Sequence, residues 1–330
     1  MTVLVTGGTG FVGMALIEAL LGRGDAVIAV AIDELPAAAR SIPGRERLKL
    51  VKADIRDRDA MDMVMGEHRI DRIFHGAVIT AGTEREAADP KTILDVNLAG
   101  TVAVLESARR HGVSRFVYPS SVAVYGESLY GPGPMSEATT PPVPVGLYGI
   151  TKYAAERMSL RLGELWGLDV VCPRIGAVFG PWERDTGLRD LLGPQFQLAR
   201  AAIRGETAIL PARFARRDWI YSRDLAAGLL SLLDVPAPRY RVYNLSAACD
   251  WTQALPDFCA KLQTLNPAFR WRIAGSDEKP TIVGHEDRDR AMQDTTRLAE
   301  DVGFTRRTGP AEAMADYARW IEWNAGMFEC

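Results

Sequence analysis

The sequence predicts an α/β fold: a doubly wound parallel sheet with a smaller, discontinuous C-terminal subdomain for the substrate. Apolar, strand-like runs alternate with helix-like segments over the first half of the chain. A glycine-rich turn joins the first of these runs to the first helical segment. From about residue 180 the alternation loosens into shorter segments with clustered Pro, Trp and Arg, which indicates a second, smaller unit.

Strands that are buried on both faces of a parallel sheet have continuous apolar sequences. Runs of this kind lie at 2–7, 26–32, 48–54, 72–78, 115–121 and 168–178. A further run at 240–246 comes after the looser segments, and we expect it to return to the main sheet. Helical periodicity and stop signals predict helices at 13–24, 90–112, 148–166 and 309–324.

The composition excludes several classes of protein. A net charge of −3 gives no reason to expect nucleic acid or an anionic membrane as a partner. No C-x-x-C pair or His at metal-ligand spacing accompanies the cysteines, so we expect reduced thiols and no metal site. The chain opens on TVLVTGG, without signal-peptide features, and no apolar run is long enough to span a bilayer, so we expect a cytoplasmic location. The four cysteines are Cys172, Cys249, Cys259 and Cys330.

The stretch TGGTGFVG, residues 6–13, follows the first expected strand and opens the first expected helix. Gly8, Gly10 and Gly13 fit a G-x-G-x-x-G pattern, and Gly7, Gly10 and Gly13 fit G-x-x-G-x-x-G. Glycine is needed because the turn is tight, a pyrophosphate must approach bare backbone, and the helix must pack close to the sheet. The motif therefore predicts a Rossmann-type dinucleotide site, with phosphates at the free N–H groups of the helix start. The residues expected to line it are Gly7, Gly10, Phe11, Val12 and Gly13.

Asp33 follows the second expected strand, twenty residues after Gly13. A carboxylate at this position can accept hydrogen bonds from the adenosine ribose hydroxyls. Its negative charge repels a 2′-phosphate, and no Arg follows it directly, so NAD is favoured over NADP.

These signals divide the chain into two parts. Residues 1–174 are expected to form an NAD-binding Rossmann domain, completed by a return strand near 218–246. Residues 175–217 and 247–330 are expected to form the substrate-binding subdomain.

A tyrosine and a lysine lie four positions apart in LYGITKYAAE, residues 147–156. At that spacing Tyr148 and Lys152 share one face of a helix. The spacing by itself is also compatible with an ordinary amphipathic helix that carries a surface lysine. Other motifs must decide between the two.

Taken together, the motifs resemble those of the extended short-chain dehydrogenase/reductase family, which contains NAD-dependent nucleotide-sugar epimerases and dehydratases such as UDP-glucose 4-epimerase. The resemblance covers nearly the whole chain and implies the catalytic residues Ser121, Tyr148 and Lys152. It also implies cofactor contacts by Asp54, Ile55, Ala77 and Pro173, and a homodimer built on the helices at 90–112 and 148–166. The segments that carry it, besides TGGTGFVG and YGITK, are KADIRD (52–57), HGAVITAG (75–82), SSVAVYGE (120–127), CPRIGAVFGPW (172–182) and RRDWIYSRDLAAG (216–228).

The resemblance gives each catalytic residue a role. A free tyrosine has a pKa of about 10, and the Lys152 ammonium and the oxidised nicotinamide ring would both lower that pKa. Tyr148 could then take the proton from a substrate hydroxyl while hydride passes to the nicotinamide. Ser121 would hydrogen-bond the same oxygen, and Lys152 would also anchor the nicotinamide ribose. Asn97 either belongs to a supporting polar network or is a structural or solvent-facing residue.

Departures from the family pattern bear on the reaction. Sugar 4,6-dehydratases carry an acidic pair directly after the catalytic hydroxyl, where this chain has Val122 and Ala123. Ala177 replaces an asparagine that contacts the nucleotide diphosphate in epimerases, and Glu286 and Asp287 would repel a diphosphate.

Basic residues provide a different candidate contact with the substrate. Arg217 matches a family arginine, and with Arg213 and Arg216 it could clamp one carboxylate or phosphate of a smaller substrate. A solvated basic loop is an equal alternative for Arg213 and Arg216.

These departures favour an NAD-dependent enzyme of carbohydrate metabolism that oxidises a secondary hydroxyl of a small sugar, sugar acid or polyol, with Tyr148 as the base. A nucleotide-sugar 4-epimerase with tightly held NAD is the alternative. A protein that senses dinucleotide without turnover ranks third, because such relatives commonly lose the Tyr or the Lys.

Overall fold

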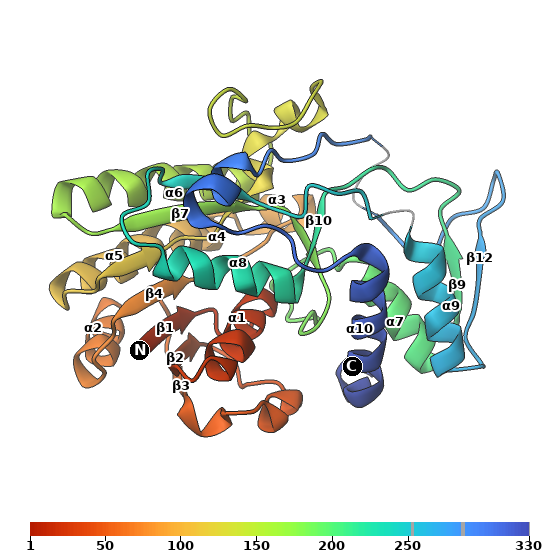
Figure 1. The fold of residues 1–330 in the computed structure, drawn as a ribbon, viewed down its shortest axis with the longest axis horizontal. Coiled ribbons are helices and arrows are strands. Elements are labelled where there is room, and N and C mark those ends of the chain that lie inside the picture. The colour runs from red at the N-terminus through yellow and green to blue at the C-terminus, as the bar shows by residue number, and fades with distance from the viewer. Residues whose placement is uncertain (252–253, 285–287, 330) are drawn as a thin grey trace.

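The core of the molecule is a parallel sheet with helices on both faces, so the predicted doubly wound α/β fold is confirmed (Figure 1). The computed structural model describes residues 1–251, 254–284 and 288–329. Within these residues the sheet has eight strands in the order β11-β7-β5-β4-β1-β2-β3, and β6 pairs with β7. The strands are β1 (Thr2–Thr6), β2 (Ala26–Ala31), β3 (Leu48–Lys52), β4 (Arg72–His75), β5 (Arg115–Val117), β6 (Ser120–Ser121), β7 (Val170–Ile175) and β11 (Val242–Leu245).

Strand order reverses at β1, which pairs with β2 on one side and with β4 on the other. Both pairs are parallel, so the carboxyl ends of β1 and β4 lie at the same edge of the sheet. The crevice at such a reversal is where open α/β sheets bind their ligands.

Alternate side chains of each strand enter different cores, because neighbouring strand residues point to opposite faces. Val3 and Val5 pack into the cluster that contains α1 and α8. Leu4, between them, packs into the cluster that contains α2, α5 and α6. The helices that cover the sheet are α1 (Phe11–Gly22), α2 (Arg58–Glu67), α5 (Thr101–Arg110), α6 (Leu147–Trp166) and α8 (Ser222–Asp234).

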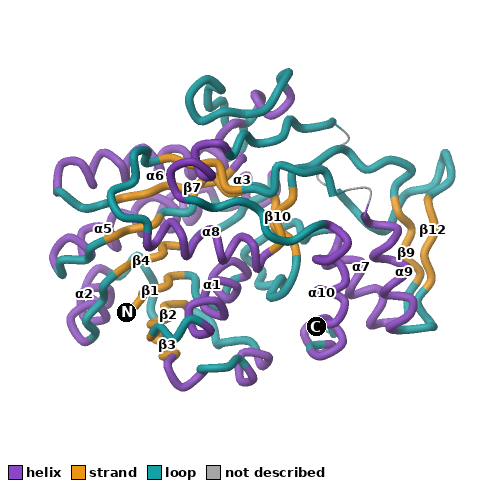
Figure 2. The backbone as a smooth tube through the Cα atoms, viewed as in Figure 1, coloured by secondary structure: helices purple, strands orange, loops and turns teal. Residues whose placement is uncertain are grey.

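A second group of elements lies beside the sheet, at the right of Figure 2. Here β10 pairs with β8 and β12 pairs with β9. Phe258 of α9 stacks on Tyr317 of α10, with ring centroids 5.6 Å apart. These elements precede and follow β11, which lies beside β7 in the main sheet. The proposed domain limits stay a prediction. The elements are α7 (Pro194–Arg204), α9 (Leu255–Leu265), α10 (Pro310–Trp323), β8 (Ala177–Phe179), β9 (Thr207–Leu210), β10 (Trp219–Tyr221) and β12 (Arg270–Ile273).

The predicted helix at 90–112 is divided by a π-helical turn. The chain forms α4 (Pro90–Leu94), then the π turn Asp95–Gly100, then α5. The Thr101 hydroxyl donates a 2.8 Å hydrogen bond to the Asn97 carbonyl oxygen, so a side chain takes part in the local backbone bonding. The homodimer expected from this helix and α6 stays a prediction.

The predicted strand at 115–121 is divided as well. Pro119 lies between β5 and β6 and has no N–H to donate to a strand ladder. The remaining short elements are α3 (Thr83–Ala88), 3₁₀ helices at Ala37–Ser41, Arg45–Arg47, Val122–Tyr125, Glu127–Tyr130 and Ala325–Phe328, and a π turn at Leu298–Val302.

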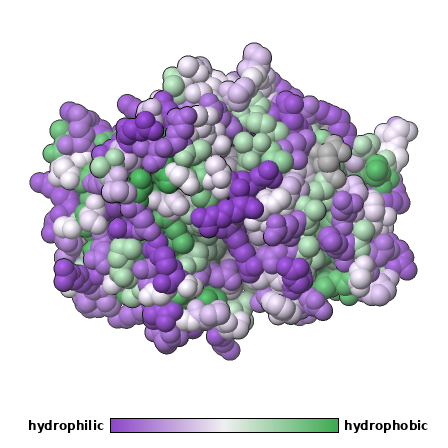
Figure 3. All heavy atoms as spheres, in the orientation of Figure 1, coloured by the Kyte–Doolittle hydropathy of each residue, from purple (hydrophilic) through white to green (hydrophobic). Residues whose placement is uncertain are grey.

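Hydrophilic residues cover most of the face shown in Figure 3, and hydrophobic residues form small groups among them. In the part of the chain that the structure describes, no helix has both the length and the apolar sequence needed to cross a membrane. Cys172, Cys249 and Cys259 are free thiols, whereas Cys330 lies outside the described residues.

Candidate active site

The glycine turn between β1 and α1 leaves no room for side chains. Gly7 has φ +65°, and a Cβ on it would lie 2.8 Å from the Gly76 carbonyl oxygen. A Cβ on Gly13 would lie 2.3 Å from the Gly7 carbonyl oxygen. Gly10 precedes α1, and no side chain caps the first turn of this helix. Bare backbone and uncapped N–H groups therefore meet at one point, which fits the pyrophosphate of a dinucleotide.

The acidic residues predicted to contact adenosine follow β2 and β3. Asp33 is half-buried just beyond the end of β2. Asp54 accepts hydrogen bonds from Nε and Nη2 of Arg56 at 3.0 Å and 2.6 Å, and this contact holds the pKa of the Asp54 carboxyl below its usual value. The side chain of Ile55, beside it, is buried. Both acids lie at the edge of the sheet that carries the glycine turn, where the sequence predicted the adenosine half of the cofactor.

Ser121, Tyr148 and Lys152 come together at the same edge of the sheet. Ser121 ends β6, and the other two residues lie in the first two turns of α6. The hydroxyls of Ser121 and Thr80 lie close enough to the Tyr148 hydroxyl to act on its pKa. Ser121 therefore lies beside the Tyr148 oxygen, whereas the Lys152 amine binds the Pro119 carbonyl oxygen. The catalytic roles of all three residues stay a prediction.

The ionisation of this group differs from the sequence expectation. Burial raises the pKa of Tyr148, opposed by the Ser121 hydroxyl, the Arg189 charge and the Thr80 hydroxyl. Lys152, predicted to lower the pKa of Tyr148, instead donates from Nζ to the Pro119 carbonyl oxygen at 2.7 Å. Burial lowers the pKa of Lys152 to about 7. Desolvation acts on both groups and favours the neutral phenol and the neutral amine.

Asn97 belongs to a buried polar network, which was one of the two alternatives for this residue. Its Oδ1 accepts a 2.9 Å hydrogen bond from the Ile79 N–H. Its Nδ2 donates to the Ile79 carbonyl oxygen at 3.1 Å and to the Thr151 hydroxyl at 3.0 Å. The network ties the segment after β4 to α6, so it positions Thr80 relative to Tyr148.

His75 is a structural residue in this arrangement. It is fully buried, and its ring nitrogens contact the hydroxyls of Thr6 and Thr101 at 2.8 Å and 3.0 Å. Burial, together with the Lys152 charge, lowers the pKa of His75 to about 3. Among the described residues, no group of three or more His, Cys, Asp or Glu is placed to hold a metal ion. His285 lies outside those residues.

The remaining predicted contacts have different surroundings. Ala77 donates its backbone N–H to the Thr6 hydroxyl at 3.2 Å, beside the glycine turn. Phe11 and Val12 are partly buried at the start of α1, and Pro173 is buried in β7 opposite Tyr243.

Arg217 is buried, and its Nη1 donates to the carbonyl oxygens of Arg216 and Arg288 at 2.9 Å and 2.6 Å. Backbone oxygens thus engage the guanidinium that was predicted to bind the substrate, and that role stays a prediction. The Arg213 guanidinium and the Arg216 backbone N–H both bind the Asp289 carboxylate, at 2.5 Å and 2.8 Å. Glu286 and Asp287 lie outside the described residues.

Three residues near the site were missed by the sequence reasoning. Thr80 lies within HGAVITAG, a segment already matched to the family, so its hydroxyl could have been recognised as a candidate. Arg184 and Arg189 lie after β8, where the sequence pattern loosens. Arg184 donates from Nη2 to the Thr9 carbonyl oxygen at 3.1 Å, across 175 positions of the chain. Periodicity carries no signal for a contact of that kind.

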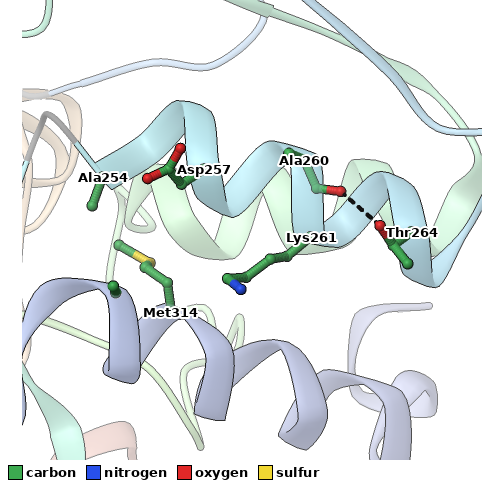
Figure 4. Close-up of a pocket in the computed structure, with 7 residues that line it drawn as sticks. Ala254, Asp257, Ala260, Lys261, Thr264 and Met314 are labelled. Carbon is green, nitrogen blue, oxygen red and sulfur yellow. Dashed lines mark hydrogen bonds between the residues drawn. The ribbon is translucent and has the colours of Figure 1, made fainter.

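A separate hollow of about 350 Å³ lies between α9 and α10 (Figure 4). Lys261 and Met314 border it from the two helices, and Thr264 donates to the Ala260 carbonyl oxygen at 3.1 Å. None of the predicted catalytic or cofactor residues lines this hollow. The carboxyl ends of β1 and β4, where the predicted residues gather, therefore remain the candidate active site.

Comparisons with known proteins give relatives over the whole chain. The model of the NAD dependent epimerase/dehydratase family matches residues 3–246. UDP-glucose 4-epimerase of Neisseria meningitidis serogroup C is 31% identical over 251 residues, covering 68% of this chain and 71% of the relative. dTDP-glucose 4,6-dehydratase of Streptomyces antibioticus is 26% identical over 338 residues, covering 100% and 95%. The crystal structure of Thermus thermophilus UDP-glucose 4-epimerase in complex with NAD has a TM-score of 0.74 at 26% identity, covering 97% of this chain and 99% of that chain.

Proposed function

Because the chain belongs to the NAD-dependent epimerase/dehydratase family, as its motifs predicted, we propose that it is a nucleotide-sugar 4-epimerase that keeps NAD bound through the reaction. The family agrees with the cofactor expected from the glycine turn and Asp33. The dehydrogenase acting on a small sugar, which the sequence favoured, is not confirmed. The 4-epimerase alternative fits better, because the relatives are named for nucleotide sugars.

The residues at the sheet edge have complementary tasks in this proposal. The glycine turn would hold the pyrophosphate, and Asp33 would hold the adenosine ribose. The chemistry that NAD supplies when bound is acceptance and return of a hydride. Tyr148 would take the proton from the substrate hydroxyl and return it after the oxidised sugar has rotated to present its other face. Ser121 would fix the substrate oxygen, and Lys152 would hold the nicotinamide ribose.

The observation that carries the proposal is the pair of apolar residues beside Ser121. Val122 and Ala123 begin the 3₁₀ helix that follows the catalytic serine. Elimination of water needs an acid for the leaving hydroxyl and a base for the neighbouring C–H, and neither side chain can serve. The site is therefore suited to oxidation and reduction at one carbon, which favours epimerisation over dehydration.

One departure concerns the substrate. Ala177 in β8 cannot donate the hydrogen bond that an asparagine gives to a nucleotide diphosphate in epimerases. A diphosphate substrate must therefore find its donors elsewhere on the second group of elements. The non-catalytic sensor is disfavoured, because Tyr148 and Lys152 are both present and Tyr148 contacts Ser121.

The proposal is tested with purified protein and a panel of UDP-glucose, UDP-glucuronate and UDP-N-acetylglucosamine. Products are identified by NMR, and the nucleotide released on denaturation is measured against protein. We expect retained NAD and conversion of one panel member to its 4-epimer, both without added cofactor. The dehydrogenase would be restored by protein that lacks nucleotide and turns over no panel member, but forms NADH from a free sugar once NAD is added.

A further inference from the structure

The segment between β8 and α7, residues 181–193, connects both sides of the cofactor crevice. On the β1 side, Trp182 Nε1 donates to Glu18 Oε2 of α1 at 2.9 Å. On the β4 side, the Thr80 N–H donates to the Leu188 carbonyl oxygen at 2.9 Å. Asp190 pairs with Arg85 at 2.7 Å and accepts a hydrogen bond from the Gly82 N–H at 2.7 Å. The segment therefore crosses the carboxyl ends of β1 and β4.

Buried side chains fix the start of this segment. Glu183 is fully buried and accepts hydrogen bonds from the Gly193 N–H at 2.8 Å and from Arg189 Nη1 at 3.0 Å. Trp182 is also buried and meets Trp320 edge to face, with ring centroids 5.4 Å apart. Arg184 follows these two anchors directly, so its backbone position is well determined.

The Arg184 guanidinium lies over the glycine turn. Its Nη2 donates to the Thr9 carbonyl oxygen at 3.1 Å. Its Nε is buried, and it has no hydrogen-bond partner among the described residues. The charge of Asp33 also acts on the group: burial lowers the pKa of Arg184, and Asp33 opposes this shift. Buried N–H groups are nearly always paired, and a phosphate oxygen bound at the glycine turn could accept the hydrogen bond that this Nε lacks.

We infer that Arg184 is a further ligand of the cofactor pyrophosphate and reaches it from the segment that follows β8. Arginine is suited to this contact because its planar group donates several hydrogen bonds to phosphate oxygens. The contact to Thr9 places the guanidinium at the pyrophosphate rather than at a 2′-phosphate, which Asp33 would repel. Residues 181–193 are anchored on both sides, so contacts outside the glycine turn hold Arg184 beside it.

The inference rests on the proposed function, since an epimerase must retain its cofactor through each cycle. The test compares Arg184→Ala and Arg184→Lys with Arg161→Ala, which removes an exposed charge from α6. Nucleotide-free protein is titrated with NAD and with NADP by calorimetry, and circular dichroism checks that each variant is folded. Retained NAD after gel filtration of the untreated protein gives a second measurement.

We expect Arg184→Ala to weaken the binding of NAD and NADP by the same factor, about 10-fold or more, as for loss of one charged hydrogen bond. Arg184→Lys should lose less affinity for the two nucleotides, and Arg161→Ala should bind them as the parent does. Unchanged NAD affinity in folded Arg184→Ala, or a loss confined to NADP, would overturn the inference. Failure of the proposed function is distinguishable, because it would appear in the unaltered chain as absent epimerisation, whatever Arg184 contributes to the binding of NAD.

Discussion

The Lys152 ammonium is hydrogen-bonded to the Pro119 carbonyl oxygen at 2.7 Å, in surroundings that leave the lysine 3% exposed. The same nitrogen lies 4.8 Å from the centroid of the Tyr118 ring. These contacts only partly offset the desolvation of the charge, and burial lowers the pKa of Lys152 to about 7.

This pKa predicts a pH-dependent gain in stability for Lys152→Met. The unfolded chain keeps the usual lysine pKa of about 10.4, so between pH 7 and that value it binds more protons than the folded chain. The penalty of burying Lys152 is therefore complete below pH 7 and shrinks as the pH rises. We expect the stability difference between variant and parent to be larger at pH 6 than at pH 9, by up to about 3 kcal/mol. Urea unfolding at the two pH values measures it, and a difference independent of pH would contradict it.

Replacing Tyr148 by Phe should strongly reduce turnover and leave NAD binding unchanged. The substitution removes the hydroxyl that is proposed to carry the proton but keeps the ring, so we expect activity to fall about 10³-fold while NAD remains bound. Activity is measured by product analysis, and NAD by quantifying the nucleotide released on denaturation. Activity close to that of the parent would show that another group carries the proton.

Gly13→Ala should reduce both NAD binding and thermal stability. The added Cβ would lie 2.3 Å from the Gly7 carbonyl oxygen, so α1 must move away from the turn that is proposed to hold the phosphates. Gly22→Ala, at the other end of α1, is a matched control, because a Cβ there meets nothing within 4 Å. Calorimetric NAD titration and a thermal scan of both variants test this. Equal NAD affinity and thermal stability in the two variants would contradict the role in phosphate binding that is proposed for the turn.

Glu156→Gln should destabilise the fold strongly. Glu156 is fully buried and pairs with Arg174 at 2.7 Å, while the Ser120 hydroxyl donates to it at 2.6 Å. Breaking a buried pair leaves an uncompensated charge on Arg174, which costs about 3–5 kcal/mol.

The matched control for this prediction is Glu164→Gln, at the exposed pair with Arg161 on the same helix. An exposed pair of this kind contributes about 0–1 kcal/mol. Urea unfolding at pH 7 separates the two cases, and similar losses in both would contradict the prediction.

The main sheet could be predicted because strands covered on both faces have continuous apolar sequences. β12 was missed, and its burial explains why: Arg270, Arg272 and Ile273 are exposed, so this short strand has no apolar run. The π turn at Asp95–Gly100 was also missed, since the sequence there keeps the periodicity of one continuous helix.

The features of the candidate site also fall into two groups, those that could be predicted from the sequence and those that could not. The glycine turn, Ser121, Tyr148 and Lys152 lie in local motifs, so their positions could be read from the sequence. The raised pKa of Tyr148 could not, because it depends on burial by segments far apart in the chain. Arg184 was missed for a related reason, since its contact with Thr9 depends on how the chain folds back over the crevice.

The most direct test of the account follows one hydrogen atom. Nucleotide sugar carrying deuterium at C4 is incubated with the purified protein, and the product is examined by NMR and mass spectrometry. If the bound cofactor accepts the hydride and returns it to the same sugar, the 4-epimer keeps its deuterium and no reduced nicotinamide accumulates in solution. Loss of the label, with one equivalent of reduced cofactor released per turnover, would contradict the epimerase and identify a dehydrogenase.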